Sequence, residues 1–212
     1  MSGIPHPFSF DPSYGYSTDQ LLAINHEGAE PLGFVDFWQQ LHEKSERVPL
    51  EITTEELQSP DPSFRLILAF YTVYPDYRVG AWIICPVDSS KVRFGIVCGH
   101  GYGGREEPEW DKAAPDRIVI FPVAPGFQIS ASSGLPLNDA SRHVIHGIGD
   151  KETYVLASCA CALWRAIDVL GAVSPHPLEQ FHYCGWSFAG GIGALMLPWE
   201  PRFTSAELGQ PT

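Results

Sequence analysis

Residues 183–191 read Tyr-Cys-Gly-Trp-Ser-Phe-Ala-Gly-Gly, and this segment is the most informative part of the chain about its fold. A strand-like segment enters it and a helix-like segment, residues 189–196, leaves it. Gly185 and Ala189 stand two residues before and two after Ser187, where strand and helix backbones of such a turn nearly touch. The pattern predicts a nucleophile elbow, which lifts the Ser187 hydroxyl above a sheet and points a helix N-terminus toward it. The alternative is an ordinary turn or capping serine, because this spacing also arises by chance in a glycine-rich chain.

A second glycine-rich loop lies upstream, where residues 97–104 read Val-Cys-Gly-His-Gly-Tyr-Gly-Gly. It directly follows a short apolar run, and this is where an α/β-hydrolase places an oxyanion donor. We therefore expect the backbone amides of Tyr102 and Phe188 to form an oxyanion hole beside Ser187. A plain glycine-rich turn is the alternative. His100 precedes the elbow, whereas this fold places its base after the serine, so we expect His100 to shape the loop.

The rest of the chain alternates between strand and helix patterns. Residues 64–73 and 79–87, joined by a turn at 75–77, predict an antiparallel hairpin. Short apolar runs predict further strands, and apolar residues at helical spacing predict a long helix that Asp150 caps. We expect an α/β-hydrolase fold, with a mostly parallel sheet after the antiparallel entry hairpin. The remaining predicted elements are helices at 18–24, 36–44 and 150–170 and strands at 93–98, 117–123 and 180–184.

Composition narrows the function classes. The 212 residues carry a net charge of −12, which argues against nucleic-acid binding. No run approaches the roughly 18 uninterrupted apolar residues of a membrane span. The odd number of scattered cysteines favours buried thiols and a cytoplasmic setting over a disulfide framework.

A metal site is not expected. Cys159 and Cys161 point to different faces of one helix, and no ligand cluster accompanies His143 and His146. We therefore expect neither metal nor cofactor. Residues 106–111 form an acidic run, which we expect to be a solvated loop.

Taken together, these residues resemble the acetyl xylan esterase and cephalosporin-C deacetylase family of carbohydrate esterases (family 7) in the α/β-hydrolase superfamily. The similarity spans roughly residues 30–212. The stretches that carry it are Asp36-Phe37-Trp38, Gly80-Ala81-Trp82, His100-Gly101-Tyr102-Gly103-Gly104, Tyr154 with residues 164–170, and the elbow at 185–191.

The resemblance implies a serine carboxylesterase that removes acetyl groups from acetylated sugars or xylo-oligosaccharides. Ser187 would be the nucleophile, and the family typically forms homo-oligomers. The sequence departs from the family pattern at Trp186, Phe188 and Ala189, where the family has Gly, Gln and Gly. Residues 124–128, Ala-Pro-Gly-Phe-Gln, stand where the family has Arg-Gly-Gln, so the arginine is absent.

The end of the chain bears on activity. The 25 residues after Ser187 contain no histidine, although a serine hydrolase needs a base within hydrogen-bond reach. We expect residues 1–33 to be an extension and residues 34–212 to be the N-terminal part of one α/β-hydrolase domain, incomplete at its C-terminal edge. The chain alone is then expected to be inactive, and a non-catalytic binding or assembly module is the alternative.

Overall fold

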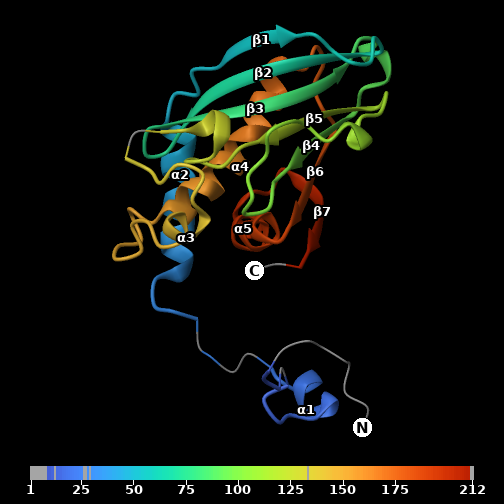
Figure 1. Ribbon diagram of the computed structural model, residues 1–212. Coiled ribbons are helices and arrows are strands. Elements are labelled where there is room, and N and C mark those ends of the chain that lie inside the picture. Colours follow the sequence, from blue (N-terminus) through green and yellow to red (C-terminus); the bar gives the residue numbers. More distant parts are fainter. Residues whose placement is uncertain (1–8, 12, 26–27, 29, 133, 211–212) are drawn as a thin grey trace. The chain divides into compact units, whose positions relative to one another are not determined.

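The computed structural model describes residues 9–11, 13–25, 28, 30–132 and 134–210 (Figure 1). The helices are α1 (Thr18–Leu22), α2 (Phe34–Arg47), α3 (Ala140–His143), α4 (Val155–Val173) and α5 (Phe188–Met196). The strands are β1 (Thr53–Leu57), β2 (Phe64–Val73), β3 (Tyr77–Pro86), β4 (Phe94–Cys98), β5 (Arg117–Pro122), β6 (Gln180–Trp186) and β7 (Phe203–Gly209).

The strands form one sheet in the order β1-β2-β3-β5-β4-β6-β7. Strands β1, β2, β3 and β5 pair antiparallel, and β5, β4, β6 and β7 pair parallel. The α/β fold and the antiparallel entry hairpin are thus confirmed. The antiparallel part is larger than predicted because β1 adds a strand beside β2. Within the described residues, β1 and β7 are the edges of the sheet.

Helices α4 and α5 pack on one face of this sheet. Two buried tyrosines fasten them: the Tyr71 hydroxyl on β2 donates to the Ala162 carbonyl at 2.9 Å, and the Tyr183 hydroxyl on β6 donates to the Ala189 carbonyl at 2.6 Å. The Trp164 indole N–H donates to the Met196 carbonyl and joins the two helices. Buried polar groups need such partners, so these bonds fix where α5 begins relative to the sheet.

The long helix α4 begins later than predicted. Its N-cap is Tyr154, and the capping role expected of Asp150 is wrong. The Asp150 carboxylate instead accepts from the Glu152 amide in a turn before the helix. Among the described residues, α4 is the helix long and apolar enough to cross a membrane, and 78% of its most apolar window is buried. That burial is typical of a core helix.

A chain of charged groups ties α2 and α4 to the segment before β7. The Glu200 carboxylate, 1% exposed, lies 3.2 Å from Nε2 of His42 and accepts from the Arg202 guanidinium. Arg202 also pairs with Asp168, which lies 2.9 Å from Arg165. Burial alone would raise the pKa of Glu200, but the bonds from Arg202 and His42 outweigh it and lower that pKa to about 2. These ion pairs join parts of the chain that are distant in sequence.

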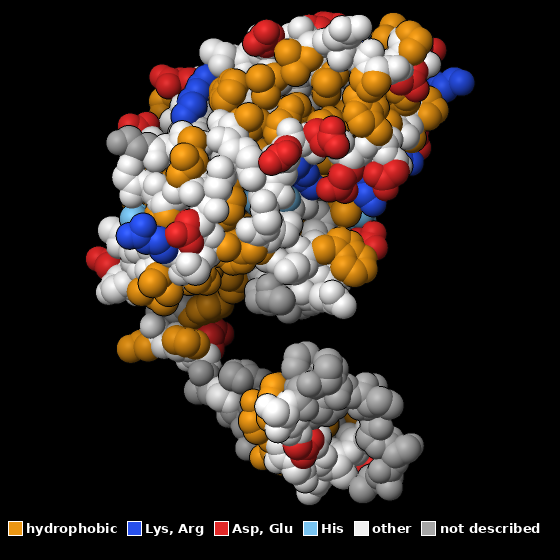
Figure 2. All heavy atoms as spheres, in the orientation of Figure 1, with side chains coloured by type: hydrophobic (Ala, Val, Ile, Leu, Met, Phe, Trp, Pro, Cys, Tyr) orange, Lys and Arg blue, Asp and Glu red, His pale blue; other side chains and the backbone are white. Residues whose placement is uncertain are grey.

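The chain divides into two units, residues 1–34 and Val35–Thr212. In the first, the Ser17 hydroxyl accepts from the Gln20 amide and the Gln20 side chain accepts from the Ser17 amide, a capping box that starts α1. On the face of the molecule shown in Figure 2, acidic side chains are scattered over the surface, as the net charge leads one to expect.

Candidate active site

Ser187 lies at the sharp turn between β6 and α5. Its backbone has φ 52° and ψ −120°, a conformation that a residue with a side chain rarely adopts. The Ser187 amide donates to the Gly209 carbonyl at the end of β7, at 2.9 Å. Its side chain does not cap α5, so the first turn of the helix does not engage the hydroxyl. The structure therefore has the sharp, strained strand-to-helix turn that the sequence pattern predicted at Ser187.

Close backbone packing explains the small residues around the serine. A Cβ added to Gly185 would lie 2.6 Å from the Tyr183 hydroxyl and 2.7 Å from the Ala189 carbonyl oxygen. A Cβ added to Gly99, on the loop after β4, would lie 2.6 Å from Cβ of Ala189. The spacing of Gly185 and Ala189 therefore reflects a real steric limit, which the sequence pattern predicted.

The glycine-rich loop after β4 sits beside the elbow. The Gly99 amide donates to the Cys184 carbonyl at 2.9 Å, which links the loop to β6. The buried Arg105 guanidinium donates to the carbonyls of Cys98 and Gly99 and pairs with Glu109 at 2.6 Å. Glu109 is exposed, as expected of a residue in a solvated acidic run, and it also pairs with Arg105.

Gln128 also holds this loop. Its side-chain oxygen accepts from the Arg105 amide at 3.1 Å, and its side-chain amide donates to the Gly103 carbonyl at 3.4 Å. A Cβ on Gly104, where φ is +78°, would lie 2.1 Å from the Gln128 oxygen. A side chain at Gly104 would be strained at this φ and would displace the Gln128 amide from the loop, so glycine is favoured here.

The structure brings Tyr102, Phe188 and Ser187 into one region. The rings of Tyr102 and Phe188 lie 4.2 Å apart between centroids. In the part of the chain that the structure describes, neither the Tyr102 nor the Phe188 backbone amide donates a hydrogen bond to the protein. Phe188 is the first residue of α5, where a helix leaves amides unpaired. Two unpaired amides beside an elbow serine can stabilise a negatively charged oxygen.

His100 is buried beneath the loop. Its Nε2 accepts from the Ala124 amide at 2.8 Å, which requires the proton on Nδ1, 2.7 Å from the Gly101 carbonyl. Burial lowers the pKa of His100 to about 4. The histidine is therefore neutral with both nitrogens engaged, and the prediction that it shapes the loop is confirmed.

His143 is a residue that sequence reasoning did not connect with this site. Its Nε2 lies 2.8 Å from the Pro125 carbonyl, and the Tyr102 hydroxyl lies 3.2 Å from its Nδ1. The imidazole is fully buried and packs against Tyr102, Phe127 and Phe188. It supports the aromatic cluster that carries Tyr102. In the sequence, only its nearness to His146 was visible.

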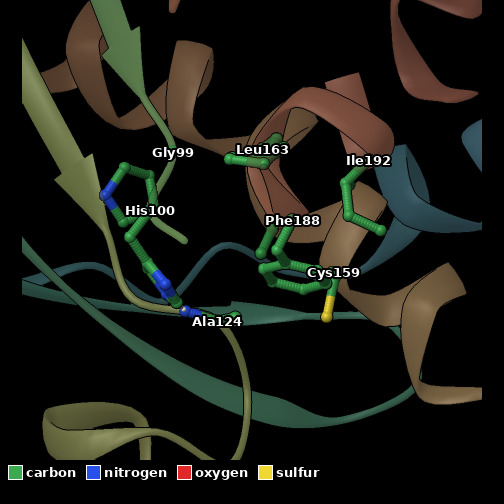
Figure 3. A pocket seen from close by; sticks show the side chains of 10 residues that line it. Gly99, His100, Ala124, Cys159, Leu163, Phe188 and Ile192 are labelled. Atoms are coloured by element: carbon green, nitrogen blue, oxygen red, sulfur yellow. Dashed lines mark hydrogen bonds between the residues drawn. The ribbon is translucent and has the colours of Figure 1, made fainter. Parts of the chain in front are cut away.

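A small apolar cavity of about 20 Å³ lies behind the elbow. Figure 3 shows the Phe188 ring at its centre beside Cys159 and Leu163, with Ile192 of α5 across from His100. Phe188 thus turns its ring inward, whereas Trp186 on the other side of Ser187 is 53% exposed. The cavity is large enough for about one water molecule and belongs to the packing of α5.

Within the described residues, no group of three or more His, Cys, Asp or Glu side chains could hold a metal ion.

The strand order, the elbow turn and the adjoining glycine-rich loop define the α/β-hydrolase class of fold. A family model described as acetyl xylan esterase (AXE1) matches residues 14–203. The chain belongs to this family. No curated protein sequence matches the chain.

Two solved structures show the same fold. The acetyl xylan esterase 1 of a Thermoanaerobacterium species has 16% identity and a TM-score of 0.72, and the match covers 85% of this chain and 59% of that one. The acetyl xylan esterase of a Paenibacillus species has 18% identity and a TM-score of 0.78, with 92% and 65% covered. The chain thus spans less than two thirds of the length of either structure.

Proposed function

We propose that this chain carries the nucleophile and the oxyanion hole of a serine carboxylesterase that removes acetyl groups from acetylated carbohydrates. The Ser187 oxygen would attack the ester carbonyl and form an acyl-enzyme, which water then hydrolyses. The amides of Tyr102 and Phe188 would stabilise the oxyanion. The observation that carries the proposal is the backbone of Ser187, φ 52° and ψ −120°, beside two unpaired amides. The family supports the acetyl ester as substrate.

Among the residues that the structure describes, no histidine forms a hydrogen bond with the Ser187 side chain to act as the base that this chemistry needs. Protein groups occupy both ring nitrogens of His100 and of His143. His100 bonds to the Gly101 carbonyl and the Ala124 amide, and His143 bonds to the Pro125 carbonyl and the Tyr102 hydroxyl. Because a general base contributes roughly 10²–10⁴-fold, the 212-residue chain alone is expected to have little esterase activity. Purified chain should hydrolyse p-nitrophenyl acetate no faster than its Ser187→Ala variant. A rate that this substitution abolishes would contradict the expectation.

Covalent labelling tests the proposed nucleophile Ser187 separately from the missing base, because imidazole added to the solution can act as the base. The chain is incubated with a fluorophosphonate probe, with and without imidazole, and adducts are mapped by mass spectrometry. We expect imidazole to accelerate labelling of Ser187 in the wild-type chain and to produce no adduct in Ser187→Ala. Absence of a Ser187 adduct under both conditions would overturn the proposal and favour a non-catalytic α/β-hydrolase-like module.

The cytoplasmic setting and the homo-oligomer remain predictions. Size-exclusion chromatography with light scattering on the purified chain measures the oligomeric state directly.

A further inference from the structure

We propose that Cys98 and Cys184 form a peroxide-sensitive thiol pair that closes to a reversible disulfide beneath the candidate active site. The two residues are register partners on the adjacent parallel strands β4 and β6. Register partners on parallel strands point to the same face of a sheet. Adjacent strands lie about 4.7–4.9 Å apart, within the Cα separations of roughly 4.4–6.8 Å at which disulfides form.

The surroundings favour reaction at Cys184. The adjacent Cys98 thiol and the Lys112 ammonium lower the pKa of Cys184, against the opposing effect of burial. The neighbouring Cys184, together with burial, raises the pKa of Cys98. Two carboxylates, Glu109 from the loop and Glu207 from β7, face the pair and oppose ionisation of Cys184. Cys184 is 8% exposed, and Cys98 is 1% exposed.

The other cysteines have no such environment. All five lie in the described residues and are buried and unpaired by disulfides. Burial raises the pKa of Cys85, Cys159 and Cys161. Because the thiolate is the reactive form, these three should react slowly. The pair on β4 and β6 is therefore the selective site.

The reaction is balanced with a peroxide as the oxidant. The Cys184 thiolate attacks one oxygen of hydrogen peroxide, the O–O bond breaks, and hydroxide leaves and becomes water, so that Cys184 becomes a sulfenic acid. Cys98 then loses its proton, and its sulfur displaces the sulfenic hydroxyl as a second water. The two thiols are oxidised by two electrons in total, and one peroxide is reduced to two waters.

The position of the pair gives the bond a structural consequence. Cys98 directly precedes Gly99 of the glycine-rich loop, and Cys184 lies three residues before Ser187. The Gly99 amide is already bonded to the Cys184 carbonyl. A covalent bond here would fix the spacing of the two strands from which the loop and the elbow start.

Thiol counting tests the proposal without any reference to esterase activity. The native chain is treated with one equivalent of hydrogen peroxide, unfolded, and alkylated with N-ethylmaleimide. We expect the alkylated cysteines to fall from five to three, with a Cys98–Cys184 linked peptide, and dithiothreitol to restore all five. Cys159→Ala should still form the same disulfide.

The single variants separate the two roles. Cys184→Ala should form no disulfide. Cys98→Ala, treated with at least two equivalents of hydrogen peroxide, should accumulate a sulfinic acid on Cys184 that dithiothreitol does not reverse, because the first equivalent gives the sulfenic acid and the second oxidises it further. Five alkylated cysteines after treatment, a linkage to another cysteine, or overoxidised Cys184 in the wild-type chain would each overturn the proposal. The wild-type peptide map decides the question even where a variant does not fold.

Discussion

The ring of Tyr102 lies on the ring of Phe188, with 4.2 Å between their centroids. The two residues come from different elements, the loop after β4 and the first position of α5, and they carry the two amides that we propose for the oxyanion hole. A side-chain contact therefore links the two segments that carry these backbone amides. The Tyr102 hydroxyl extends the same contact to His143.

Two substitutions of Tyr102 measure the contributions of its hydroxyl and of its ring to stability separately. Tyr102→Phe removes the bond to His143 and keeps the ring, so it should destabilise the chain by about 0.5–1.5 kcal/mol. Tyr102→Ala also removes the aromatic contact, and aromatic pairs add about 0.5–1.5 kcal/mol beyond buried area. Urea unfolding of both variants measures the difference. Equal stabilities for the Phe and Ala variants would mean that the stacked rings contribute nothing.

Gly185→Ala tests the close packing at the elbow. The new Cβ would lie 2.7 Å from the Ala189 carbonyl oxygen, which is helix backbone and cannot move alone. Overpacking of this kind costs about 1–3 kcal/mol. Gly101→Ala is the matched control, because nothing lies within 4 Å of a Cβ there. Thermal unfolding should show a clear loss for Gly185→Ala and little change for the control, and the reverse order would refute the steric explanation.

Glu200 predicts a loss of stability in acid. Its pKa is lowered from 4.5 to about 2, so the ionised form is favoured in the folded chain. The stabilisation is complete above pH 4.5 and is lost as the pH falls toward 2. By linkage, a pKa shift of this size corresponds to about 3 kcal/mol in the free energy of unfolding.

Urea unfolding measured across this pH range tests the prediction. Glu200→Gln should be less stable near neutral pH and should lose less stability on acidification than wild type. Glu43→Gln, which removes an exposed ion pair with Arg47 that is worth little, should keep the wild-type pH dependence. A Glu200→Gln curve parallel to wild type would assign the acid loss to other groups.

The imidazole of His100 should remain neutral at pH values well below the usual pKa of a histidine. Burial lowers its pKa from 6.5 to about 4, so the unfolded chain binds a proton before the folded chain does. The stabilisation that depends on neutral His100 is therefore complete above pH 6.5, and it is lost as the pH falls from 6.5 to 4. Titration by NMR, with the His100 resonance assigned from its absence in His100→Asn, should show the transition near 4. A transition at 6.5 would show that the imidazole is not buried and engaged as described.

The helices and strands with a clear apolar pattern could be predicted from the sequence. The hairpin β2–β3, strand β6 and helix α5 have patterns that match their burial, and all were predicted close to their observed bounds. The edge strands β1 and β7 were not predicted, because nearly all their residues are exposed and no apolar pattern marks them. They are strands through pairing with a neighbour, which is a tertiary effect.

The residues of the candidate site likewise fall into two groups, those that a local sequence pattern predicted and those that only the structure revealed. Gly185, Ser187 and Ala189 were visible because a steric limit fixes both residue type and spacing. Arg105, Gln128 and His143 hold the glycine-rich loop through contacts between distant segments. No local pattern encodes such contacts, so their roles emerged only from the structure. Asp150 was misassigned because an acidic residue suits either a turn or a helix start.

The bond from the Ser187 amide to the Gly209 carbonyl has a consequence for biosynthesis. Chains emerge from the ribosome N-terminus first, so β6 and α5 are available before β7. Until β7 docks, the Ser187 amide has no strand to bond. The turn at Ser187 thus reaches its final form only after β7 has been synthesised and has docked beside β6.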